Sequence, residues 1–299
     1  MFDHPELASF ETLAGLRRLL VEPGVTDLVV NGHDSICLLR GGVWFGTPSP
    51  FPSALELDEL AQAIASAGSK RLDLAPPFAS VVFDGRIRVH LVLRSGVSGK
   101  TLISLRVLGE RAFGLAQLAQ AGMFDEPSRS RLSELMRSGA SVLISGASGS
   151  GKTTLLRAML LEVVGQRAIA IEDIDELRID SPNFVAMQSR AANVEGRGSI
   201  DMSELLVESL RMRPDRIVVG EIRSRELITL LQAAQSGHAI AATIHANSAE
   251  QVGDRIASIA ALSGNSSSDF AELARKSIDA IVHIENRSGQ RSITIRERR

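Results

Sequence analysis

The sequence predicts an α/β fold in which a smaller N-terminal α+β domain precedes a larger domain with a mostly parallel sheet. Three observations support this prediction. The chain has 299 residues, enough for two domains of ordinary size. Within residues 81–107, apolar and polar residues alternate as in a β-hairpin with one buried face. After residue 120, short apolar runs alternate with longer stretches of helical spacing, which is typical of a parallel sheet covered by helices on both faces.

The N-terminal domain is expected over residues 1–110. Two segments have the apolar spacing of helices, and three short apolar runs around glycine-rich turns predict strands; these are 7–21 and 55–67, and then 28–30, 36–39 and 43–45. Three prolines within residues 47–52 predict a loop. In the hairpin, the residues that alternate with the apolar ones are basic and form one face, namely Arg86, Arg88, His90 and Arg94.

A linker is expected over residues 111–120, and the second domain over residues 121–299. The predicted strands of this domain are 141–145, 168–172, 216–219, 240–244 and 280–285. Its predicted helices are 152–164, 202–211, 225–235 and 249–262. The serine-rich stretch 263–269 predicts a loop.

The composition excludes several classes of protein. Lysine and arginine number 33 against 35 aspartate and glutamate, a net charge of −2, so we expect no direct nucleic-acid binding. With 44% hydrophobic residues the chain is not intrinsically disordered, and no apolar run reaches the ~18 residues that cross a bilayer. The acidic N-terminus lacks the layout of a signal peptide, and the single Cys37 excludes an internal disulfide and a cysteine-cluster zinc site. We therefore expect a cytoplasmic protein that can still dock on a membrane complex.

The strongest local motif is GASGSGKT at residues 146–153, which follows an apolar run and opens a helical one. This context is the one that a phosphate-binding loop requires, whereas an incidental Gly/Ser loop would not need it. Glycines let backbone N–H groups turn toward phosphate oxygens, Lys152 reaches the β- and γ-phosphates, and the Thr153 hydroxyl coordinates Mg²⁺. The residues expected to bind ATP are Gly146, Ala147, Ser148, Gly149, Ser150, Gly151, Lys152, Thr153 and Thr154.

Acidic residues follow two of the predicted strands. Glu221 ends the run RIVVG, where it would orient or deprotonate an attacking water; the alternative is a helix N-terminal acid. The aspartate that usually precedes such a glutamate is replaced by Gly220. The run AIAIEDIDEL places Glu172 and Glu176 beyond another strand, where clustered acids indicate a bound cation or, alternatively, a solvated acidic turn. The expected metal ligands are Thr153, Glu172 and Glu221.

Histidines and arginines complete the set of candidates. His238 and His245 flank one predicted strand, and either would sense the γ-phosphate, although a lone histidine is more often structural. Five arginines bracket the Glu221 strand, some to form salt bridges and one or two to neutralise transition-state charge; they are Arg211, Arg213, Arg216, Arg223 and Arg225. Of these, Arg211 is our candidate for catalysis.

The order of the segments GASGSGKTT, AIEDIDEL, RMRPDRIVVGEIR and SGHAIAATIHANS resembles the secretion ATPase superfamily of type II and type IV secretion. Within it, the chain is most similar to ATPases of tight-adherence pilus assembly and conjugal transfer. The resemblance implies a RecA-like P-loop NTPase domain with a Walker A motif at 146–153, an Asp box at 172–177, an atypical Walker B motif ending at Glu221, and a His box at 238–245. DLVVNG at 27–32 looks like that family's N-terminal domain.

The resemblance also implies how such a protein works. It implies a cytoplasmic homo-hexamer at the inner face of the cell membrane, hydrolysing ATP between domains and subunits and acting on an inner-membrane platform protein. Family arginines that contact the γ-phosphate match Arg88 and Arg106, for which the alternative is a solvent-facing basic edge. SRAANVEG and SRE depart from the family pattern and put partner contacts in question. A DNA-transfer motor and a nucleotide-gated scaffold with little hydrolysis are the alternative functions.

Overall fold

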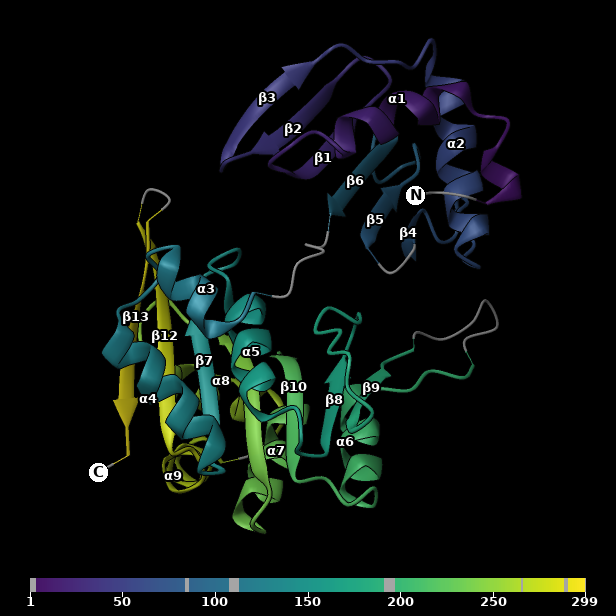
Figure 1. Ribbon diagram of the computed structural model, residues 1–299. Helices are drawn as coiled ribbons and strands as arrows, with labels where there is room; N and C mark the ends of the chain where they lie inside the picture. Colours follow the sequence, from purple (N-terminus) through teal and green to yellow (C-terminus); the bar gives the residue numbers. More distant parts are fainter. Residues whose placement is uncertain are drawn as a thin grey trace. The chain divides into compact units, whose positions relative to one another are not determined.

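The computed structural model describes residues 4–83, 86–107, 113–190, 197–264, 266–287 and 290–298. The chain divides into two compact units, Met1–Glu110 and Arg111–Arg299, each of which is described by itself (Figure 1). None of the helices in the described ranges is long and apolar enough to cross a membrane.

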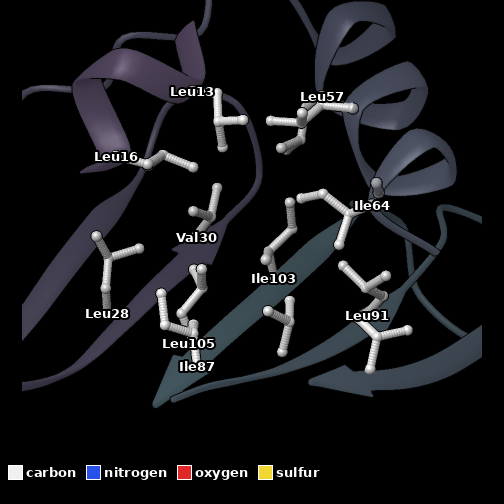
Figure 2. Packing of buried hydrophobic residues seen from close by; sticks show 14 of the residues in the cluster. Leu13, Leu16, Leu28, Val30, Leu57, Ile64, Ile87, Leu91, Ile103 and Leu105 are labelled. Carbon is white, nitrogen blue, oxygen red and sulfur yellow. The ribbon is translucent and has the colours of Figure 1, made fainter. Parts of the chain in front are cut away.

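The first unit is an antiparallel six-stranded sheet in the order β3-β2-β1-β6-β5-β4. Its strands are β1 (Val25–Asn31), β2 (Ile36–Arg40), β3 (Val43–Thr47), β4 (Phe78–Phe83), β5 (Ile87–Val92) and β6 (Leu102–Val107). Its helices are a 3₁₀ turn (Pro5–Leu7), α1 (Glu11–Leu20) and α2 (Ala54–Ala67). The two α-helices bury their apolar sides on one sheet face, where Leu16 and Ile64 pack with strand residues such as Leu105 (Figure 2).

The expected alternation in the hairpin is confirmed. Ile87, Val89 and Leu91 are buried, whereas Arg88 is half-buried and His90 exposed. One face of β5 therefore belongs to the core and the other is basic, as the period of two predicts.

The second unit is a seven-stranded sheet in the order β13-β12-β7-β11-β10-β8-β9, parallel except for β13. Its strands are β7 (Val142–Gly146), β8 (Ala168–Glu172), β9 (Phe184–Gln188), β10 (Arg216–Ile222), β11 (Ala239–His245), β12 (Ala280–Arg287) and β13 (Gln290–Glu297). Its helices are α3 (Leu115–Gln120), α4 (Glu126–Arg137), α5 (Lys152–Leu160), a 3₁₀ turn (Leu161–Val163), α6 (Met202–Leu210), α7 (Glu226–Gln235), α8 (Val252–Leu262) and α9 (Ser267–Ser277). The predicted mixed α/β fold with a mostly parallel sheet is confirmed.

Helices cover both faces of this sheet. Along β7, Val142 and Ile144 belong to the core under α3, α4 and α5, while Leu143 belongs to the core under α6, α7, α8 and α9. Because successive residues of a strand point to opposite faces, the two cores lie on opposite sides. β7 lies inside the sheet between β12 and β11 (Figure 1), so its carboxyl end is flanked by strands on both sides.

Two segments that were predicted as a linker and a loop contain helical residues. Residues 113–120 of the expected linker include α3, whose Leu115 is fully buried in the second unit's core, while 111–112 lie outside the described residues. The expected loop 263–269 instead contains the start of α9, because the Ser266 hydroxyl accepts a hydrogen bond from the Asp269 amide and caps the helix.

A fully buried arginine joins the amino-terminal edge of the second sheet to α4. Arg216 donates from its guanidinium to the carbonyls of Met136 (2.9 Å) and Ala140 (2.9 Å), and more weakly to that of Ile240 (3.4 Å). Burial lowers its pKa to about 10. Met136 lies in the last turn of α4, where the carbonyls carry partial negative charge, so its carbonyl helps to stabilise a cation that has no carboxylate partner among the described residues.

Candidate functional site

The phosphate loop lies where β7 ends and α5 begins, and two of its glycines are required by geometry. Gly146 has φ +153°, and a Cβ there would lie 2.7 Å from the Ile284 carbonyl oxygen and 2.7 Å from Ser150 Oγ. Gly151 has φ +106°, a conformation that L side chains rarely adopt. Both positions therefore exclude a side chain.

Lys152 fills the centre of this loop. Its side chain is buried, and Nζ donates to the carbonyls of Gly146 (3.0 Å) and Ala147 (2.9 Å). Burial lowers the pKa of Lys152, and the negative charge of Glu221 partly offsets this effect. The ammonium group thus lies inside the loop, in the position from which a phosphate would receive its hydrogen bonds.

His245 connects Lys152 to Glu221. Its Nδ1 lies 3.2 Å from Lys152 Nζ, and its Nε2 lies 3.0 Å from Glu221 Oε1. Burial, together with the positive charge of Lys152, lowers the pKa of His245, so the ring is neutral at pH 7. Because an ammonium group can only donate, Nδ1 is the acceptor, and Nε2–H donates to the carboxylate. The His245 ring therefore has one defined tautomer, and the hydrogen bonds run in one direction, from Lys152 to His245 and from His245 to Glu221.

Glu221 also accepts a hydrogen bond from Arg223, at 2.8 Å. Burial by itself would raise the pKa of Glu221, but the Arg223 hydrogen bond and the nearby positive charges outweigh it, and the pKa is lowered. Arg223 donates in addition to Asp173 (3.0 Å), which accepts from the Ser189 hydroxyl (2.8 Å). This line of contacts runs along the carboxyl edge of the sheet from the phosphate loop to the end of β9.

Glu172 lies at the same edge, on the neighbouring strand β8. It is 3% exposed, and its carboxylate accepts from the backbone amides of Glu176 (3.2 Å) and Leu177 (3.2 Å). Burial raises its pKa to about 8, and the nearby acids act in the same direction. Glu176 contributes its backbone amide to this arrangement.

The structure does not bring every candidate to this group. His238 precedes β11, whereas His245 ends it, so the strand separates them by about 20 Å; His238 instead lies 3.3 Å from the Ala233 carbonyl. Arg211 follows α6 at the opposite edge of the sheet and pairs with Glu208 (2.6 Å).

Arg88 and Arg106 belong to the first unit. They lie directly opposite each other on β5 and β6, and Arg106 pairs with Asp27 of β1 at 2.8 Å. Both are therefore on the basic face expected from the sequence.

Of two further arginines at this edge, Arg223 is among the five named from the sequence, whereas Arg291 is not. Arg223 follows Glu221 by two residues and forms salt bridges to Glu221 and Asp173, the role expected for some of the arginines around this strand. Arg291 donates from Nε to the Ser150 carbonyl (3.0 Å), but it comes from β13, a strand that was not predicted.

The donor set suits a magnesium nucleotide. Ser150 Oγ is buried and has no hydrogen-bond partner among the described residues, so the loop contains an unsatisfied hydroxyl close to Gly146. In the described part of the chain, no three His, Cys, Asp or Glu residues form a group that could hold a metal by themselves. Mg²⁺ ordinarily takes only one or two carboxylates and fills its other positions with phosphates and water, so an ionised strand-end carboxylate such as Glu221 and a hydroxyl such as that of Thr153 are ligand types that suit this ion.

Comparisons with known proteins agree with these features. A family model described as type II/IV secretion system protein matches residues 86–285. A putative conjugal transfer protein of Mycobacterium tuberculosis (strain ATCC 25618 / H37Rv) is 35% identical over 287 residues, covering 93% of this chain and 82% of that protein. The type IV secretion system protein PtlH of Bordetella pertussis (strain Tohama I) is 31% identical over 291 residues, covering 85% of this chain and 86% of that protein.

Solved structures share the fold. The pilus retraction motor PilT with bound ADP is similar at a TM-score of 0.70 and 21% identity, covering 95% of this chain and 82% of that one. The ATPase DotB of Legionella pneumophila is similar at a TM-score of 0.66 and 19% identity, covering 99% and 82%.

Proposed function

Since this chain belongs to the type II/IV secretion system protein family, we propose that it binds ATP with Mg²⁺ at the phosphate loop and hydrolyses it to drive protein secretion or pilus assembly. The observation that carries the proposal is the connected set Lys152–His245–Glu221, in which one neutral imidazole joins the phosphate-loop cation to a strand-end carboxylate. Such a set links phosphate binding to the group that handles water.

Each residue has a role in this proposal. Lys152 would exchange the loop carbonyls for phosphate oxygens, which frees His245 Nδ1 to interact with the nucleotide. Glu221, ionised at neutral pH because its pKa is lowered, would orient the attacking water and accept its proton. When bound, Mg²⁺ would neutralise phosphate charge, held by Thr153, Glu172 and Glu221.

The working form in this proposal is a cytoplasmic homo-hexamer docked on a membrane platform protein. Arg88 and Arg106 would contact the γ-phosphate. Their support is the cross-strand pairing on a basic face, which concentrates two guanidinium groups at one place on the sheet. Arg106 would have to leave Asp27 or share it.

The relative from Mycobacterium tuberculosis, a putative conjugal transfer protein, favours DNA transfer as a second candidate. A motor that grips DNA itself would bind it with an affinity that falls steeply as salt rises. Fluorescence anisotropy of labelled duplex and single-stranded DNA at two salt concentrations distinguishes this candidate from a motor that acts only on protein partners.

The test of the proposed function is the steady-state ATPase rate against protein concentration, with particle size followed by light scattering. We expect the specific rate to climb with concentration and Glu221→Gln to lower kcat by about 10²-fold or more while ADP still binds. Glu285→Gln is the matched control, because Glu285 is a strand carboxylate paired with Arg287 instead. Arg88→Ala should lower the rate without weakening ADP binding. A wild-type chain that binds no nucleotide would disprove the proposal.

A further inference from the structure

A second cation reaches the phosphate loop from outside the motif. Arg291 Nε–H donates to the Ser150 carbonyl oxygen at 3.0 Å. A Cβ at Gly151 would lie 3.6 Å from Arg291 Nε and 3.8 Å from its Cδ, so the arginine side chain passes directly over the glycine. The contact thus falls on the one peptide unit that joins Ser150 to Gly151.

The strand pairing explains why Arg291 reaches this point. Gly146 pairs with Ile284 of β12, and Ile284 pairs with Ile293 of β13. Because β13 runs antiparallel to β12, Arg291, two residues before Ile293, lies about 6–7 Å further toward the carboxyl edge, beyond the end of β7. The strand pairing of the C-terminal hairpin therefore places Arg291 beside the loop, so the contact follows from the backbone register.

Arg291 differs from the other arginines of this hairpin in its partners. Arg287 pairs with Glu285, Arg296 with Glu250, and Arg298 with Asp279. Within the described ranges Arg291 has no carboxylate partner, and its only acceptor there is the Ser150 carbonyl. A guanidinium group has five N–H donors, so four remain for another acceptor beside the loop.

The contact also fixes the direction of the shared peptide. In a trans peptide the C=O and the following N–H point in opposite directions. Because the Ser150 carbonyl is turned toward Arg291, the Gly151 N–H points the opposite way, away from Arg291, where it would be available to a phosphate oxygen.

We propose that Arg291 is a nucleotide-positioning residue of the phosphate loop, which orients the Ser150–Gly151 peptide toward the phosphates and adds positive charge there. The inference rests on the proposed function, since it takes the loop's ligand to be a nucleotide phosphate. It assigns part of the binding site to the C-terminal hairpin, outside the sequence motif.

The test is calorimetric titration of ADP and of pyrophosphate into the full chain at about 50 mM and 500 mM salt. Arg291→Ala should weaken both ligands about tenfold at low salt, the loss expected for one charge-assisted interaction. The loss should shrink at high salt, because screening reduces the charge contribution, whereas a general structural defect would persist. Arg291→Lys keeps the charge and should recover part of the affinity. It also provides a second test of the proposal if the alanine variant folds poorly.

Arg287→Ala is the matched control, since Arg287 is on the same hairpin and is paired elsewhere; its ADP affinity should stay within about twofold of wild type. If Arg291→Ala binds ADP as tightly as Arg287→Ala, the inference is wrong while the proposed function stands. If wild type binds neither ligand, the proposed function itself fails.

Discussion

Glu172 occupies the space that a side chain at position 220 would need. A Cβ built on Gly220 would lie 2.9 Å from Glu172 Cγ and 3.2 Å from Oε1. The two residues are on neighbouring parallel strands, β8 and β10, near their carboxyl ends. The carboxylate of one strand thus fills the place left by the missing side chain of the other, where the sequence has glycine instead of the usual aspartate.

Gly220→Ala should therefore destabilise the fold. The new methyl group meets Cγ of a buried side chain rather than a flexible tip, and overpacking of this kind costs about 1–3 kcal/mol. Urea denaturation followed by circular dichroism measures the loss.

The double-mutant cycle with Glu172→Ala is the control for this steric argument. If the collision is the cause, Gly220→Ala should cost at least about 1 kcal/mol less in the Glu172→Ala background than alone. An equal cost in both backgrounds contradicts the shared-space interpretation.

Arg223→Gln should lower kcat for ATP hydrolysis about tenfold with little change in ADP affinity. Arg223 holds Glu221 and Asp173 through separate nitrogens, so its loss frees the carboxylate that we propose handles water, while the phosphate loop keeps its own contacts. Arg225→Gln, an exposed arginine two residues further, should leave both quantities near wild type. Equal kinetics for the two variants would remove Arg223 from the site.

Arg216→Met should lower the free energy of unfolding by about 2–4 kcal/mol, because it leaves the buried carbonyls of Met136 and Ala140 without donors. Arg211→Met is the control, since Arg211 is exposed and should change stability by at most about 0.5 kcal/mol. Circular dichroism is the suitable probe, because the only tryptophan, Trp44, is in the first unit. A loss equal to that of the control would show that solvent satisfies these carbonyls.

His283 should make stability depend on pH. It is buried, its Nδ1 lies 2.9 Å from Ser145 Oγ, and burial lowers its pKa below the ordinary value of 6.5. The unfolded chain then takes up a proton that the folded chain refuses, so stability present above pH 6.5 falls as pH decreases through 6.5 toward the folded-state pKa. His283→Gln should reduce this slope between pH 7.5 and 5.5, measured as the urea midpoint, while the lowered pKa of His245 keeps part of it in place. An unchanged slope would contradict the role of His283.

The phosphate loop could be predicted from sequence because its requirements are local. Gly146 and Gly151 meet conformational demands within the loop, and an apolar run before it and a helical run after it supply the context. The link from Lys152 through His245 to Glu221 was not evident, since it depends on which strands are neighbours. The two histidines lie at opposite ends of β11, so only His245 reaches the carboxyl edge. The sequence motif contains both and gave no reason to prefer one.

Two of the missed elements are strands whose burial is weak. β13 exposes most of its side chains, and only Ile293 and Ile295 pack against the core, so the charged residues around them resembled a solvated tail. β9 is an edge strand with no fully buried residue. An exposed edge strand has too few apolar residues for an alternating pattern to be recognised in the sequence. Since Arg291 belongs to such a strand, it was missed.

The buried guanidinium of Arg216 anchors the amino-terminal edge of the second sheet, but it makes no contact with the carboxyl edge. It ties β10 and β11 to the end of α4 at the edge remote from the phosphate loop. Because these contacts hold β10 and β11 against α4 at the amino-terminal edge, we expect any displacement on ligand binding to be larger at the carboxyl edge. That edge carries the loops after β7, β8, β10 and β11, which are therefore the segments in which we expect ligand binding to change the backbone.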